Sequence, residues 1–81
     1  MGFYDELYKT EFMGLSHGSS FTYVEKTLGT GYYEYIGQNL QLQNVYFENF
    51  DIEICLQNGM VKYIKEGKPG WMDSDNVEKK D

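Results

Sequence analysis

The residues best suited to nucleophilic chemistry lie together in one short polar segment. Ser16, Ser19 and Ser20 flank His17, the only histidine of the 81-residue chain, so a hydroxyl nucleophile and a general base are close in sequence. The segment lacks the Gly-x-Ser-x-Gly pattern that exposes such a serine on a sharp turn after a strand. The stretch 14–20 is rich in glycine and serine, which is typical of a connecting loop, and we interpret it as a connector.

Acid–base chemistry would need paired carboxylates, and Asp51 and Glu53 form the best placed pair. Two residues apart on a strand, they share one face at a separation of about 6.6–7 Å. Lys62 is expected diagonal to Glu53 across a hairpin, which favours a cross-strand ion pair over catalysis. Glu11 falls within an apolar stripe, and we interpret it as a rim residue that reaches solvent rather than as a buried acid with a chemical role.

The composition predicts neither a metal site nor a bound cofactor. The single histidine and the single cysteine, Cys55, are far apart and match none of the spacings of zinc sites. A lone cysteine in the middle of a strand is usually a small buried apolar residue, and it excludes an internal disulfide. We therefore predict that the chain is not an enzyme.

The charge and the residue usage bear on partners and origin. The net charge is −6 and arginine is absent, which disfavours direct binding of nucleic acid, since arginine is the usual ligand of phosphate and guanine. Alanine is absent too and proline occurs once, a usage typical of an AT-rich genome such as that of a low-GC bacterium or its phage. No apolar run approaches the roughly 20 residues that span a bilayer, and no signal peptide opens the chain, so we expect a cytoplasmic protein without membrane contact.

The strongest structural pattern is a β-hairpin over residues 50–65. Apolar and polar residues alternate up to Leu56, and Asn58-Gly59 suits the two positive φ angles of a two-residue turn. This turn predicts four cross-strand pairs: Gln57 with Met60, Leu56 with Val61, Cys55 with Lys62, and Ile54 with Tyr63.

The other elements follow from shorter patterns. Residues 3–13 are predicted as an amphipathic helix, 21–28 as a strand, 29–31 as a hairpin turn into a strand at 32–36, and 40–47 as a strand with a β-bulge near Asn44. The predicted fold is α+β and mainly β, with the N-terminal helix packed on an antiparallel sheet or small barrel of about five strands. Residues 1–72 form the single domain in this prediction, and 73–81 form a polar, mobile tail.

A run of tyrosines suggests a binding surface. Tyr32 and Tyr33 must face opposite sides of a strand, so at least one side presents aromatic surface. We expect partner-binding residues there and among nearby acids: Tyr32, Tyr33, Glu34, Tyr35, Asp51 and Glu53. The function predicted from this is a small acidic binding protein, encoded by a phage or mobile element, that inhibits a host or cognate protein by occluding it. A partner that handles nucleic acid fits such an acidic surface.

An alternative function is sequestration of a small ligand resembling a nucleotide, held by tyrosine stacking and by backbone amides of the Gly/Ser loop. Its ligand-binding residues would be Ser16, His17, Gly18, Ser19, Lys26 and Thr30. Either function is compatible with a homodimer. We expect one because Tyr32, Tyr35, Ile36, Met60 and Ile64 cannot all share a covered sheet face with Ile54, Leu56 and Tyr63.

Overall fold

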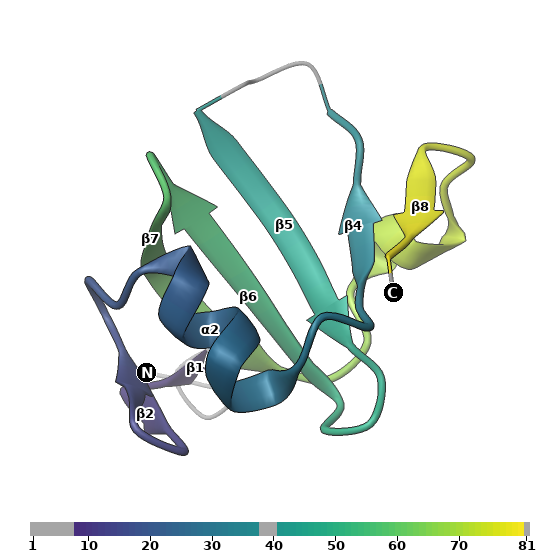
Figure 1. Ribbon diagram of the computed structural model, residues 1–81. Coiled ribbons are helices and arrows are strands. Elements are labelled where there is room, and N and C mark those ends of the chain that lie inside the picture. Colours follow the sequence, from purple (N-terminus) through teal and green to yellow (C-terminus); the bar gives the residue numbers. More distant parts are fainter. Residues whose placement is uncertain (1–7, 38–40, 81) are drawn as a thin grey trace, which may run out of the picture.

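The computed structural model describes residues 8–37 and 41–80, which form eight β-strands and one α-helix. Six strands make one antiparallel sheet in the order β1-β7-β6-β5-β4-β8, and β2 and β3 form a separate two-stranded hairpin. Helix α2 lies across one face of the sheet, in front of β6 (Figure 1). The elements are β1 (Tyr8–Lys9), β2 (Glu11–Phe12), β3 (Leu15–Ser16), α2 (Phe21–Leu28), β4 (Tyr33–Tyr35), β5 (Leu42–Phe47), β6 (Ile52–Gln57), β7 (Met60–Glu66), the 3-10 helix η1 (Gly70–Asp73) and β8 (Val77–Lys79).

The predicted fold class is confirmed in its coarse form and wrong in its details. The chain is a small single domain, mainly β, with an antiparallel sheet and one described helix. The main sheet has six strands rather than about five, and it does not close into a barrel, because β1 and β8 each have a neighbour on one side only within the described residues. The described helix follows three short strands instead of opening the chain.

The segment predicted as a strand at residues 21–28 is helix α2. Ser20 caps the helix, since its Oγ accepts a hydrogen bond from the backbone N of Tyr23 at 3.2 Å. Val24 and Leu28, four residues apart, are buried against the sheet, and Phe21 packs beside them. The same segment also alternates between apolar and polar residues, which led to the predicted strand. The N-cap and the helical spacing of Val24 and Leu28 favour the helix, because the sheet buries these two residues.

The predicted helix at residues 3–13 is wrong for the part that the structure describes, and residues 3–7 lie outside the described residues. Tyr8 and Lys9 pair with β7 as an edge strand, and a tight hairpin follows. Met13 and Gly14 form the turn of this hairpin with φ of 54° and 90°. Such backbone angles end any helix, and two apolar residues of the predicted helix, Tyr8 and Phe12, lie in two different strands.

The turn of the predicted long hairpin is confirmed. Asn58 and Gly59 have φ of 54° and 79°, as a two-residue turn of this kind requires. The two pairs nearest the turn are also confirmed, namely Gln57 with Met60 and Leu56 with Val61. The predicted turn at 29–31 does not join two strands, because it connects α2 to β4 after a C-cap at Gly29.

A β-bulge then shifts the register of this hairpin. Cys55 lies opposite Tyr63 instead of Lys62, and Ile54 lies opposite Ile64 instead of Tyr63. Lys62 is therefore the extra residue, and it turns Ile64 onto the same face as Val61. The bulge predicted near Asn44 is wrong, since β5 pairs with β6 in continuous register from Leu42 to Phe47.

The bulge completes the core beneath α2. We call this side of the sheet the helix face. It carries alternate residues of β5 and β6 together with two residues of β7, and helix and hairpin residues cover it. The buried apolar side chains of this cluster are Leu15, Val24, Leu28, Tyr32, Val45, Phe47, Ile52, Ile54, Leu56, Val61 and Ile64.

The opposite side of the sheet is covered by the connection from β7 to β8, and we call it the crossover face. The ring of Trp71, in η1, packs against Tyr35 with 5.7 Å between ring centroids. Val77 and Lys79 pair with Tyr35 and Tyr33, so β8 extends the sheet beyond β4. A strand of the sheet therefore lies within the segment 73–81 that was predicted as a mobile tail, while the division of the chain at residue 72 stays a prediction.

These two covered faces divide the apolar side chains that motivated the predicted homodimer. Tyr32 and Ile64 belong to the core of the helix face, and Tyr35 lies beneath Trp71 on the crossover face. Ile36 and Met60 are exposed by 44% and 51%. The homodimer stays a prediction, and the uncovered aromatic face that motivated it is not present among the described residues.

The turn at Gly59 allows a clean measurement of backbone strain. Gly59→Ala should lower the free energy of unfolding by about 1 kcal/mol, because a Cβ disfavours positive φ. Gly70→Ala is the matched control: neither glycine has an atom within 4 Å of the added Cβ, and only Gly59 has φ of +79°. Urea unfolding of both variants measures the difference, and equal losses would show that the turn is not strained by the side chain.

Candidate functional site

The six residues predicted to bind a partner do not form one surface. Tyr33 and Tyr35 point to the crossover face, because they pair with Tyr46 and Asn44 of β5. Glu34 lies between them in β4 and points to the helix face. As the alternation of a strand requires, Tyr32 is on the opposite side from Tyr33, and it is part of the core. Asp51 lies in the β5–β6 turn and Glu53 lies within β6.

Tyr32 is a core residue and is not available to a partner. Its side chain is 5% exposed, and its ring contacts Phe21 edge-on at 5.8 Å and Phe47 at 5.2 Å between centroids. Its hydroxyl donates a hydrogen bond to Glu25 Oε2 at 2.9 Å, which joins the start of β4 to helix α2. Burial raises the pKa of Tyr32, and the Glu25 carboxylate raises it further, so the phenol stays protonated.

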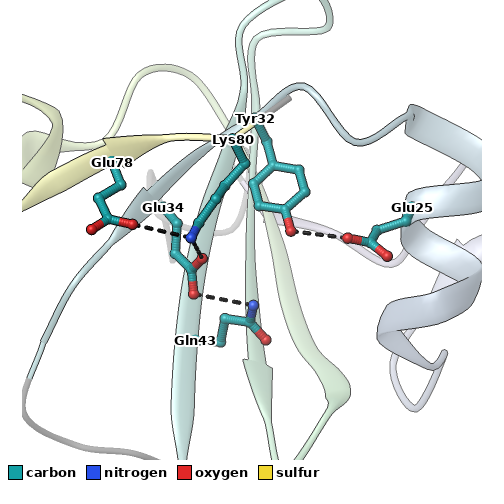
Figure 2. Close-up of polar contacts among 6 residues, drawn as sticks. All are labelled: Glu25, Tyr32, Glu34, Gln43, Glu78 and Lys80. Carbon is teal, nitrogen blue, oxygen red and sulfur yellow. Dashed lines mark hydrogen bonds and ion pairs between the residues drawn. The ribbon is translucent and has the colours of Figure 1, made fainter.

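Glu34 takes part in a polar cluster that holds the edge strand β8 (Figure 2). It lies directly opposite Glu78, and two carboxylates in this position repel each other. Lys80 bridges them, with Nζ 3.0 Å from Glu78 Oε1 and 3.8 Å from Glu34 Oε1. Gln43 Nε2 donates to the second oxygen of Glu34 at 3.2 Å. The cluster therefore offsets a charge repulsion within the sheet.

Glu53 is the most buried carboxylate of the described residues, at 4% exposure. Its Oε2 accepts hydrogen bonds from Trp71 Nε1 at 3.0 Å, Asn44 Nδ2 at 3.4 Å and Tyr63 Oη at 3.4 Å. The bulge places Lys65 opposite Glu53 and removes Lys62 from the predicted diagonal position, and the predicted ion pair is replaced by these neutral donors. A buried carboxylate is costly unless it is hydrogen-bonded, so the three donors explain how Glu53 is tolerated.

The neighbours of Glu53 favour a structural role for the group. Burial raises the pKa of the Cys55 thiol, and a thiol in that state is a weak nucleophile. Burial raises the pKa of Tyr63 as well, with a further contribution from Glu53. Among residues 8–37 and 41–80, no three His, Cys, Asp or Glu side chains come together as metal ligands.

Asp51 is held by a tyrosine of the crossover face. The hydroxyl of Tyr46 donates to Asp51 Oδ1 at 2.5 Å, and Asp51 itself has φ of 56° within the turn. Tyr46 is 5% exposed. Burial, followed by the hydrogen bond to Asp51, raises the pKa of Tyr46 from 10.0 to about 12.

The residues of the alternative ligand site do not converge. The amides of Gly18 and Ser19 donate to the backbone oxygens of Val61 and Ser16, at 2.8 and 3.0 Å, so neither amide is turned toward a ligand. Ser19 Oγ accepts from the amide of Ser16. His17 is exposed at the N-terminal end of α2. Lys26 and Thr30 lie toward the other end of this helix of eight residues, which is about 12 Å long.

Three exposed apolar residues outside the predicted sites lie in or near the β2–β3 hairpin. Met13 is 53% exposed, Tyr23 44% and Phe50 36%. Met13 fell within the predicted helix 3–13, Tyr23 within the predicted strand 21–28, and Phe50 at the start of the predicted hairpin 50–65. The pattern that could have located Met13 is the hairpin Glu11–Ser16, with an X-Gly pair between two short runs.

The comparisons with known proteins add no relative. No family model, no curated protein and no solved structure matches this chain. Within the described residues, no helix has the length and apolar character needed to cross a membrane.

Replacement of Glu53 tests whether its carboxylate holds the crossover face together. Glu53→Leu should lower the free energy of unfolding by about 3 kcal/mol, because three donors lose their acceptor in a buried site. Glu53→Gln keeps an oxygen acceptor and should lose less. Urea unfolding followed by the fluorescence of Trp71, the only tryptophan, measures both variants. Equal stability of the Leu and Gln variants would contradict this role.

The raised pKa of Tyr46 predicts a loss of stability at high pH. The folded-state value is above the unfolded one, so the contribution is complete below pH 10 and is lost as the pH rises toward about 12. Unfolding free energies of the wild type and of Tyr46→Phe, measured from pH 8 upward, should therefore converge above about pH 10. A difference that stays constant through this range would show that Tyr46 titrates at an ordinary pKa.

Proposed function

We propose that this protein is a non-catalytic binding protein that inhibits a host or cognate protein by occluding a basic surface on it. The observation that carries the proposal is the sign of the exposed charge. In the described residues seven carboxylates are exposed, against four lysines. Opposite charge on a partner steers the encounter and disfavours partners of like charge.

The state of the remaining polar groups supports binding rather than chemistry. Glu34, Asp51 and Glu53 are engaged in hydrogen bonds that hold strands, a turn and the crossover in place. All buried side-chain nitrogen and oxygen atoms of the described residues have hydrogen-bond partners. A catalytic group is commonly left without a hydrogen-bond partner, and these groups are not.

A protein that handles nucleic acid is the partner class that fits best, since its binding channel presents lysine and arginine to phosphate. Such a channel can be occupied by acidic residues in place of the nucleic acid. The origin that we propose, a phage or mobile element, rests on the composition alone. Nucleotide sequestration is not favoured, because the residues that it requires are dispersed around α2.

A salt-dependent capture experiment tests the proposal. The immobilised protein should retain a specific host protein from a lysate at about 50 mM salt and release it at about 500 mM, where the screening length falls to a few Å. A bait unfolded in urea and returned to the same column controls for capture by exposed apolar side chains. Failure to retain any specific protein at low salt would contradict the proposed function.

A further inference from the structure

Aromatic side chains from the β5–β6 turn and from α2 reach the β2–β3 hairpin at its turn. The ring of Phe50, in the β5–β6 turn, packs edge-on against Phe12 of β2, with 6.0 Å between centroids. The hydroxyl oxygen of Tyr23, on α2, lies 3.2 Å from the position that a Cβ would take on Gly14. Met13 precedes Gly14 at the tip of the turn. We call the side chains of Phe12, Met13, Tyr23 and Phe50 the hairpin patch.

The residue at the tip of the patch is unusual for its backbone conformation. Met13 and Asn58 both have φ of 54°, and each is followed by a glycine with positive φ. Asparagine is a common residue in this conformation, whereas a methionine there costs free energy without any compensating backbone hydrogen bond from its side chain. Met13 therefore combines backbone strain with 53% exposure of an apolar side chain, and neither favours folding.

The border of the hairpin patch is acidic. The two turn segments that carry Met13 and Phe50, residues 11–14 and 48–51, contain three carboxylates and no lysine. Glu11 lies closest to the tip, because its Oε2 accepts a hydrogen bond from the amide of Gly14 at 2.6 Å. Glu48 and Asp51 lie in the same turn as Phe50. An apolar centre with a charged border is the arrangement of a protein interface.

We propose that the hairpin patch is the surface by which this protein docks, and that its partner presents an apolar pocket bordered by lysine and arginine. This rests on the proposed function and assigns it to particular side chains. Met13 enters the pocket as a flexible apolar group, Phe50 and Tyr23 pack around it, and Glu11, Glu48 and Asp51 face the basic border. A second copy of the chain is a poor occupant, since it would bring the three carboxylates of each copy together.

Met13→Asn separates docking from folding. Asparagine suits the backbone of Met13, so the melting temperature should stay unchanged or rise, while the apolar contact is lost. Met60→Asn is the matched control, because Met60 is 51% exposed and lies at the far end of β6 from the turn of Phe50. Glu11→Gln keeps an oxygen for the Gly14 amide and removes one border charge, and Asp75→Asn removes one exposed charge elsewhere.

Three synthetic peptides of equal length serve as probes: one with lysine and leucine, one with lysine and serine, and one with glutamate and leucine. The first should bind most tightly and shift the NMR signals of the Met13 methyl group and the Phe50 ring. Met13→Asn should weaken this binding by about tenfold, as loss of a central anchor does, and Met60→Asn should leave it unchanged. Glu11→Gln should reduce its salt dependence more than Asp75→Asn does.

Several outcomes would overturn the assignment: no binding of the lysine-leucine peptide, equal binding of the glutamate-leucine peptide, or equal affinity of Met13→Asn and the wild type. A change in light-scattering mass on Met13→Asn would show instead that the patch joins two copies of the chain. The capture experiment separates the two proposals. A host partner retained equally by the wild type and by Met13→Asn would refute the patch alone, and a wild type that retains nothing refutes the proposed function.

Discussion

Strand β6 is buried on both faces, and its central carboxylate, Glu53, is the constraint on which the rest of the fold depends. Ile52 and Ile54 on either side of it are almost fully buried beneath α2, so Glu53 must point into the crossover face. That position is tolerable only with hydrogen-bond donors around it. The donor nearest to it comes from Trp71, 18 residues further along the chain, and the contact requires the connection from β7 to cross this face.

The β-bulge at Lys62 allows β7 to place a suitable side chain on each face of the sheet. Without the extra residue, Tyr63 would lie under α2 and Ile64 would face the crossover. With it, Ile64 completes the core, and Tyr63 turns its hydroxyl toward Glu53. One inserted residue thus supplies a core side chain to one face and a hydrogen-bond donor to the other. The crossover can then reach the far side of β4 and add β8 to the sheet.

Local patterns in the sequence correctly predicted those features that depend only on neighbouring residues. The Asn58-Gly59 turn, its two nearest pairs and the opposite orientations of Tyr32 and Tyr33 follow from backbone angles and strand alternation, and all were confirmed. The predictions for 21–28 and for the described part of 3–13 failed because an apolar pattern alone does not decide between helix and strand in a short segment. Residues 21–28 carry both an alternating and a helical pattern, and the packing of Val24 and Leu28 against the sheet selects the helix. The position of the bulge could not be predicted either. In a regular hairpin Ile64 would lie on the polar face, and an extra residue in either strand of a pair could correct this.

The candidate site was less predictable than the fold, because it depends on contacts between distant segments. The tyrosine content indicated residues 32–35 as a binding surface. In the structure, however, Tyr32 lies in the core and Tyr35 packs against Trp71 of the crossover. Alternation alone could separate their faces, but it could not show that both faces are covered. The hairpin patch has no sequence pattern of its own, since its members come from β2, its turn, α2 and the β5–β6 turn.

Two hairpin turns among the described residues provide the clearest physical contrast between folding and function. Asn58-Gly59 and Met13-Gly14 have similar positive φ angles, so both first positions favour a residue that tolerates this angle, such as asparagine. Asn58 adopts a positive φ at little cost, and its turn closes the largest hairpin of the sheet. Methionine at position 13 is less suited to a positive φ, although a single substitution would relieve the strain and expose less apolar surface. Folding alone gives no reason for a methionine at that tip, whereas the partner that we propose would bury its side chain.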